Sequence, residues 1–134
     1  MIEDDAGLRR LLENTRNIAV VGMSANPDRP SNEVAQYLRR AGYTVIPVNP
    51  AYREILGEKC YPGLREVPVE IDLVDVFRNP DDVMPIVEDA IAVGAKSLWL
   101  QLGVIAPGAV ARAEAAGLAV VMDRCTKIEH RRLV

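Results

Sequence analysis

The sequence is poor in the residues on which several kinds of function depend. Of its 134 residues, two are cysteines, one is a histidine and only 4% are aromatic. Cys60 and Cys125 are too far apart in the chain to form a metal-binding motif, and two reduced thiols are typical of a cytoplasmic protein. No apolar run approaches the roughly 20 residues that span a membrane. Residues 1–5 are acidic and lack the basic region of a signal peptide, so we expect a cytoplasmic protein without a metal centre.

The charge balance excludes a further class of function. Charged residues make up 26% of the chain and the formal net charge is −3. Domains that bind nucleic acids carry a basic surface, which this composition does not provide. Hydrophobic residues make up 49%, and the length suits one domain with its own core. We therefore expect a single domain over residues 1–134 whose partner is a small molecule, with no nucleic acid and no membrane.

Apolar runs and helical repeats alternate along the chain. The apolar runs predict strands, and the β-branched run at residues 18–21, which lacks polar alternation, is typical of a strand buried on both faces. These strands are expected at residues 18–21, 43–48, 71–77, 97–102 and 118–122. Helices are expected from Asp4 or Asp5 to about residue 14, and over residues 31–40, 80–93 and 107–116. The alternation predicts a Rossmann-like three-layer α/β/α fold with a mostly parallel sheet of five or six strands.

Some segments carry weaker or more particular signals. Ser31 is the expected N-cap of the second helix. Pro47 lies within the second strand, which indicates the end of that strand or an unpaired edge. Residues 51–68 are irregular, with one short strand expected around residues 58–61. The chain is expected to finish in a short basic tail.

The segment that follows the first strand has the composition of a phosphate site. Gly22 comes where the strand must turn, and the absence of a Cβ allows a ligand to approach the backbone. Ser24, Asn26, Arg29 and Ser31 then cluster just before a helix. The N-terminus of a helix offers unpaired N–H groups and the positive end of its dipole. A simple strand-to-helix turn is the alternative, but it would not need a cation and two serines.

We expect the ligand at the carboxyl edge of the sheet. The residues at this edge do not favour a nicotinamide cofactor. In an open parallel sheet, ligands bind beyond the carboxyl ends of the strands. There, Ser24 and Pro27 replace the second and third glycines of the dinucleotide-binding motif. Residues 48–50 lack the carboxylate that would bind ribose hydroxyls. A small NAD(P)- or nucleotide-dependent enzyme is therefore the second interpretation.

Catalytic candidates are few. The only histidine, His130, lies near the C-terminus beside Glu129, and a Cys125–His130 pair is conceivable. Asp72 and Asp75 lie in a strand expected to be buried, where structural hydrogen bonding is favoured over acid–base chemistry. The residues thus favour binding over catalysis and leave a chemical role for Cys125 or His130 open.

Several of these segments together resemble one family. They are residues 20–24 with Pro27 and residues 29–31, then residues 42–43, 47–50, 72–78, 99–103 and 122–125. In this order they resemble the stand-alone CoA-binding proteins, whose Rossmann-like domain also occurs at the N-terminus of succinyl-CoA synthetase α subunits and ADP-forming acyl-CoA synthetases. The larger ligases use a phosphorylated histidine and further domains, and His130 lies in no matching motif. The resemblance therefore implies binding of coenzyme A or acyl-CoA and leaves catalysis in doubt.

The resemblance also implies a set of binding residues. The loop 22–31 would hold phosphates through its backbone N–H groups, the Ser24 hydroxyl and the Arg29 guanidinium. Asn49 and Pro50 would border the adenosine half. The full candidate set is Gly22, Met23, Ser24, Arg29, Pro30, Ser31, Val48, Asn49, Pro50, Phe77, Arg78, Val83, Gln101 and Gly103. A protein partner that uses this chain as its CoA site is a further possibility.

Overall fold

The computed structural model describes residues 1–134, which form two sheets, five α-helices and two 3₁₀ turns. The strands are β1 (Asn17–Val21), β2 (Thr44–Val48), β3 (Glu54–Ile55), β4 (Glu58–Lys59), β5 (Leu73–Val76), β6 (Ser97–Leu100) and β7 (Ala119–Val121). The helices are α1 (Asp5–Asn14), α2 (Pro30–Arg40), α3 (Val83–Ala92), α4 (Pro107–Ala115) and α5 (Thr126–Leu133). The 3₁₀ turns are η1 (Leu64–Glu66) and η2 (Pro80–Asp82). No helix is both long enough and apolar enough to cross a membrane.

The main sheet confirms the predicted fold class. Its five strands run in the order β2-β1-β5-β6-β7, and every neighbouring pair is parallel. From β1 the chain goes first to one side, to β2, and then to the other side, to β5. The order of the strands therefore reverses between β1 and β5, and this is where open α/β sheets bind their ligands.

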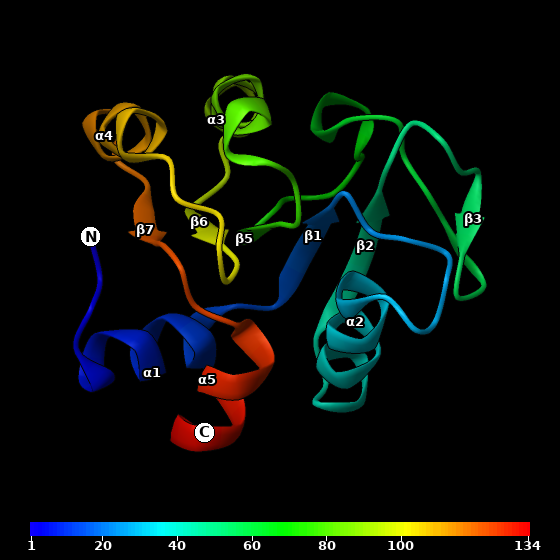
Figure 1. Cartoon of the computed structure of the whole chain (residues 1–134), viewed down its shortest axis with the longest axis horizontal. Coiled ribbons are helices and arrows are strands. Elements are labelled where there is room, and N and C mark those ends of the chain that lie inside the picture. The colour runs from blue at the N-terminus through cyan, green and yellow to red at the C-terminus, as the bar shows by residue number, and fades with distance from the viewer.

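Helices cover both faces of this sheet (Figure 1). The helices α3 and α4 lie on one face, over a core that includes Val74, Leu98 and Val120. The helices α1, α2 and α5 lie on the other face, over a second core that includes Trp99 and Leu73. The central strands are buried from both sides, which explains the apolar runs at residues 18–21 in β1 and 98–100 in β6.

Both edges of the sheet are protected. The strand β2 is an edge strand, as Pro47 indicates, and the carbonyl oxygen of Pro47 accepts a hydrogen bond from the N–H of Tyr61 (3.0 Å). The irregular segment also contains a small antiparallel hairpin of β3 and β4. At the other edge, the N–H of Ile2 donates to the carbonyl oxygen of Val120 in β7 (2.8 Å).

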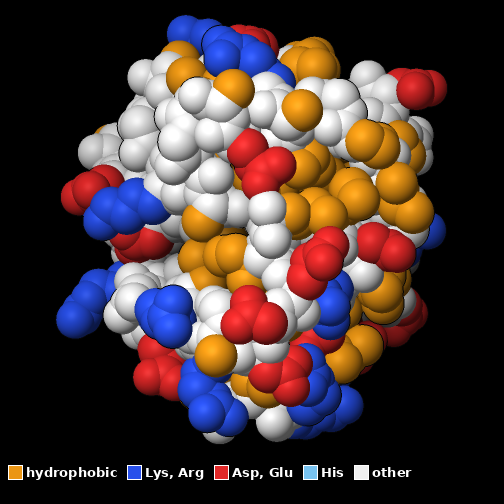
Figure 2. All heavy atoms as spheres, turned by 90° about the vertical axis from the view of Figure 1, so that its left-hand side faces the viewer, with side chains coloured by type: hydrophobic (Ala, Val, Ile, Leu, Met, Phe, Trp, Pro, Cys, Tyr) orange, Lys and Arg blue, Asp and Glu red, His pale blue; other side chains and the backbone are white.

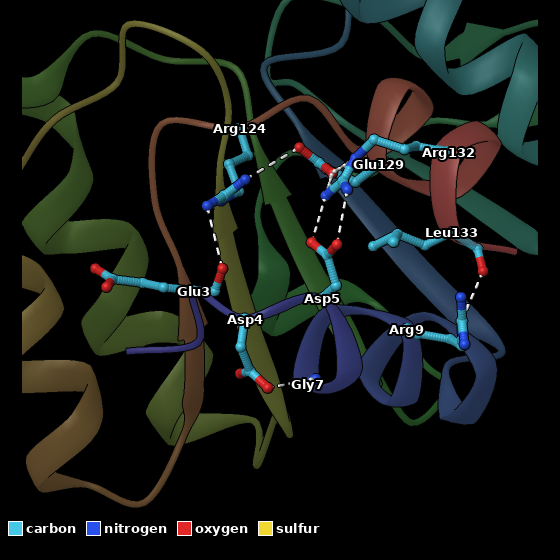
Figure 3. A network of polar contacts seen from close by, with 9 residues as sticks. All are labelled: Glu3, Asp4, Asp5, Gly7, Arg9, Arg124, Glu129, Arg132 and Leu133. Carbon is cyan, nitrogen blue, oxygen red and sulfur yellow. Dashed lines mark hydrogen bonds and ion pairs between the residues drawn. The ribbon is translucent and has the colours of Figure 1, made fainter.

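The prediction of a basic tail is wrong, because residues 126–133 form the helix α5. Charged contacts attach α5 to the start of the chain (Figure 3). Arg132 lies 2.8 Å from Asp5 and 2.7 Å from Glu129, and Arg124 donates to Glu129 at 3.2 Å. Glu129 is only 7% exposed, so this network is partly buried. It fixes the start of α5 at the carboxyl edge of the sheet.

The N-cap assignment of Ser31 is also wrong. The helix α2 begins at Pro30, with Arg29 in the cap position. Proline favours the first position of a helix because its missing N–H would have no partner there. The Ser31 side chain instead accepts a hydrogen bond from the N–H of Ser24 (2.9 Å). In contrast, Asp4 caps α1 as expected, by accepting from the N–H of Gly7 (3.3 Å).

Candidate functional site

A cleft of about 620 Å³ opens where the strand order reverses, at the carboxyl ends of β1, β5 and β6. The N-termini of α2 and α5 complete its walls. Its lining residues are Gly22, Ser24, Arg29, Pro30, Ser31, Val34, Phe77, Arg78, Asn79, Asp82, Gln101, Leu102, Val104 and Cys125. Eight of the sequence-predicted site residues are in this set. The fold therefore brings the loops after three different strands to one concave surface.

Gly22 is required by the geometry of the first loop. It has a φ of +85°, a conformation that side chains disfavour. A Cβ atom at this position would lie 2.3 Å from the carbonyl oxygen of Phe77 and 2.8 Å from the Cδ atom of Arg78. Only glycine therefore lets the loop after β1 pass so close to the loop after β5.

The loop between Gly22 and α2 is held by short polar side chains. The Ser24 hydroxyl accepts from the N–H of Asn26 (3.0 Å), and the Asn26 side chain accepts from the N–H of Asp28 (2.9 Å). The amide nitrogen of Asn32 donates to the carbonyl oxygen of Ser24 (2.9 Å). The loop is therefore shaped before any ligand arrives, with the N-terminus of α2 facing the cleft.

Two arginines bring positive charge to this cleft. The guanidinium of Arg78 lies 3.5 Å from the carboxylate of Asp82, one helical turn further along the chain. Arg29, in the cap position of α2, is exposed and makes no ion pair or side-chain hydrogen bond in the protein. Arg29 is thus a free cation at a helix N-terminus, an arrangement suited to an anion.

A smaller hollow of about 270 Å³ adjoins the cleft on the β2 side and shares Gly22, Arg78 and Asp82 with it. Its other walls are Val21, Val48, Pro50, Pro62, Gly63, Leu64, Pro85, Ile86 and Asp89. Asn49 does not line it. The Asn49 amide donates to the carbonyl oxygen of Met23 (3.0 Å), and its oxygen accepts from the N–H of Ala51 (2.9 Å). Asn49 therefore shapes the backbone on which a ligand would rest.

Below the cleft lies a buried polar cluster. Asp75, in the central strand β5, is fully buried, and its carboxylate accepts from Gln101 (2.6 Å) and from the Thr126 hydroxyl (3.0 Å). Burial raises the pKa of Asp75 to about 7, and these two hydrogen bonds only partly oppose the rise. Gln101 also lines the cleft, so the cluster connects the core of the sheet to the site.

Three of the candidate residues lie elsewhere. The side chains of Met23 and Val83 are fully buried in the two cores, so neither side chain can contact a ligand in the cleft. Gly103 has a φ of +81°, and its N–H donates to the carboxylate of Asp123 (2.8 Å). Gly103 turns the chain after β6 and does not line the cleft.

Sequence reasoning missed Thr126, the first residue of α5. Cys125 lines the cleft, and Thr126 contacts the cluster below it. Because α5 was not expected, nothing in the local pattern pointed to Thr126. Arg124 follows β7 and does not line the cleft. Its guanidinium donates hydrogen bonds to the carboxylate of Glu129 and to the carbonyl oxygen of Glu3.

A hollow of about 540 Å³, lined by both apolar and charged residues, adjoins the cleft toward the N-terminus and shares Leu102 and Cys125 with it. Met1, Met122 and Ile128 supply most of its remaining apolar surface. Figure 2 shows the side of the molecule with α4 and the N-terminus, on which apolar side chains gather between charged ones. A ligand that leaves the cleft past Leu102 therefore meets a surface on which apolar and charged residues are mixed.

The single histidine lies far from this edge. The Nδ1 atom of His130 is 2.8 Å from the Tyr37 hydroxyl. The imidazole also lines a hollow beside Asn17 and Thr44, the first residues of β1 and β2. His130 is thus at the amino edge of the sheet, opposite the cleft, and does not pair with Cys125.

Comparisons with known proteins found a matching family model and several similar proteins. A family model described as a CoA-binding domain matches residues 16–131. Protein YneT of Bacillus subtilis is 37% identical over 125 residues, which are 93% of either chain. A solved structure of a hypothetical protein from Pyrococcus horikoshii OT3 is 44% identical, has a TM-score of 0.95, and matches 98% of this chain and 92% of its own. ADP-forming acetate–CoA ligase I of Archaeoglobus fulgidus is 43% identical over 56 residues, which are 42% of this chain but only 8% of the ligase.

Proposed function

Because the chain belongs to the family of CoA-binding domains, we propose that it binds coenzyme A or an acyl-CoA in the cleft at the carboxyl edge of its sheet. The observation that carries the proposal is the unpaired guanidinium of Arg29 at the N-terminus of α2, beside the glycine turn at Gly22. Coenzyme A has a pyrophosphate and a 3′-phosphate, and its negative charge needs cations and free N–H groups.

The shape of the site supports one direction for the ligand. The phosphates lie at the loop after β1, where Arg29 and Arg78 are available. The adenosine half enters the smaller hollow on the β2 side, against Val48 and Pro50. The pantetheine arm then runs the other way, past β5 toward Gln101. The hollow beyond the cleft, where Leu102, Met122 and Ile128 supply apolar surface beside charged residues, would receive an acyl group.

A nicotinamide cofactor fits the site less well. Enzymes that bind NAD hold the ribose hydroxyls with a carboxylate after the second strand. Here that position is Asn49, and its side chain is already bound to the backbone of Met23 and Ala51. The absence of a carboxylate there suits a ligand with a 3′-phosphate, which a carboxylate would repel.

We further propose that the chain binds without a reaction of its own. In support of this, His130 lies at the opposite edge of the sheet from the cleft. The similarity to acetate–CoA ligase I covers a small part of that enzyme. This supports a second possibility, in which the chain supplies its CoA site to a protein partner that performs the chemistry.

Isothermal titration calorimetry of the purified protein tests the proposal, with coenzyme A as ligand and NAD and ATP as comparators. We expect binding of coenzyme A in preference to both. Arg29→Ala should weaken coenzyme A about tenfold or more, because it removes a charge-assisted contact to phosphate.

Arg40→Ala is the matched control, since Arg40 lies at the other end of α2 and is exposed without an ion pair. Its affinity for coenzyme A should equal that of the unaltered protein. No heat with coenzyme A, or preference for NAD, would overturn the proposed ligand. If Arg29→Ala and Arg40→Ala changed the affinity for coenzyme A equally, Arg29 would have no specific role in binding.

A further inference from the structure

Gln101 stands between the buried carboxylate of Asp75 and the cleft. Its amide nitrogen donates to the Oδ1 atom of Asp75 (2.6 Å) and to the Thr126 hydroxyl oxygen (2.9 Å). The Thr126 hydroxyl donates in turn to the Oδ2 atom of Asp75 (3.0 Å). Asp75 and Thr126 are both fully buried. Three side chains from β5, the end of β6 and the start of α5 thus form one closed polar cluster.

The cluster leaves one polar atom of Gln101 free. Its amide nitrogen has two acceptors, whereas its carbonyl oxygen Oε1 makes no hydrogen bond within the protein. Every buried side-chain nitrogen and oxygen atom in the protein has a partner. The Oε1 atom must therefore be reached by solvent, and the surface that Gln101 lines is the cleft.

Asp75 fixes which end of the amide faces the cleft. Above its pKa of about 7 the carboxyl group of Asp75 is ionised, and an ionised carboxylate can only accept hydrogen bonds. If the Gln101 amide were turned over, its carbonyl oxygen would face that carboxylate and both atoms would lose a partner. The observed orientation therefore presents an acceptor, and no donor, to whatever occupies the cleft.

We propose that the Oε1 atom of Gln101 accepts a hydrogen bond from the pantetheine arm of coenzyme A, and that Asp75 and Thr126 are positioning residues that hold it in that orientation. This inference rests on the proposed function and deepens it. The strand β6 lies two positions from β1, on the side away from β2. Strands are spaced by about 4.8 Å, so Gln101 is roughly 10 Å beyond the strand that carries the phosphate loop.

The chemistry of the ligand matches this position. The pantetheine arm that follows the pyrophosphate carries a hydroxyl group and two amide N–H groups, all of which can donate. A phosphate, in contrast, has only acceptor oxygens when it is ionised, and it would be repelled by Oε1. Gln101 therefore distinguishes the arm of the ligand from its nucleotide half.

The test compares two ligands on the same protein by titration calorimetry at pH 8, where the carboxyl group of Asp75 is ionised. One is coenzyme A, and the other is 3′-phospho-ADP, which is its nucleotide half without pantetheine. Gln101→Met should weaken coenzyme A about fivefold, the cost of one lost hydrogen bond, and leave 3′-phospho-ADP unchanged. Gln36→Met is the control, because Gln36 on α2 bonds only to Asn32 and does not line the cleft.

Asp75→Asn tests the positioning role without removing Gln101. The new amide can donate to the carbonyl oxygen of Gln101, which allows the Gln101 side chain to turn its NH₂ group toward the cleft. We expect the same selective loss for coenzyme A. Equal weakening of both ligands, or of neither, would refute the inference while the proposed function stands. Failure of the unaltered protein to bind coenzyme A would overturn both.

Discussion

Replacing Asp75 by asparagine should make the protein more stable at neutral pH and change the pH dependence of its stability. Asp75 is fully buried in the central strand β5, and burial raises its pKa from 3.8 to about 7. In the unfolded chain the carboxyl group regains water and titrates near its ordinary value. Between pH 4 and pH 7 the folded chain therefore binds more protons at this position than the unfolded chain.

The sign of the effect follows from this difference. Stability falls with rising pH wherever the folded state binds more protons. The contribution of Asp75 is thus fully favourable below about pH 4 and is lost as the pH rises through 7. A shift from 3.8 to about 7 corresponds to a loss of about 4 kcal/mol in the free energy of unfolding.

Urea unfolding of the unaltered protein and of Asp75→Asn, followed by circular dichroism at pH 4 to pH 8, measures this loss. Asparagine does not titrate, so the difference between the two free energies cancels every other ionisable group. Relative to the variant, the unaltered protein should lose about 4 kcal/mol between pH 4 and pH 8. A difference that stays constant with pH, or that moves in the opposite direction, would refute the reasoning.

Two further predictions concern other parts of the molecule. Gly22→Ala should lower the free energy of unfolding by at least about 2 kcal/mol and abolish binding of coenzyme A, because its Cβ atom would lie 2.3 Å from the carbonyl oxygen of Phe77 at a φ of +85°. Chemical denaturation and calorimetry measure the two effects, and an alanine variant of normal stability would contradict the first. Burial lowers the pKa of His130. The imidazole NMR signals of this single histidine should therefore titrate with a midpoint below 6.5. A midpoint above that value would show that the imidazole is not desolvated.

The fold can be predicted from the sequence because its signals are local. The five apolar runs correspond to the five strands of the sheet, and Pro47 marks an edge strand that is indeed at the edge. Asp4 caps the first helix as expected. The glycine after the first strand, together with the rule that ligands bind at the carboxyl edge, predicts the position of the cleft.

The errors over α5 and Val83 have a common physical cause, which is tertiary contact. The helix α5 has few apolar residues, and it is held by the contacts of Glu129 with Arg124 and Arg132 and by the contact of Arg132 with Asp5. The pair of Arg132 and Asp5 joins opposite ends of the chain, and no local window contains both partners. For the same reason, the sequence could not show that Val83 points into the core rather than toward the ligand.

Asp75 lowers the stability of the fold and at the same time sets the orientation of Gln101 in the site. An ionised carboxylate in the middle of a parallel sheet destabilises the fold, and an uncharged residue of similar size would remove that cost. The carboxylate nevertheless does something that an amide cannot, because it accepts hydrogen bonds at both oxygens and so permits only one orientation of Gln101. Asp75→Asn should therefore give a protein that is more stable at pH 8 and yet distinguishes coenzyme A less well from its nucleotide half. A variant that gained stability and kept its selectivity would show that the carboxylate has no role in binding.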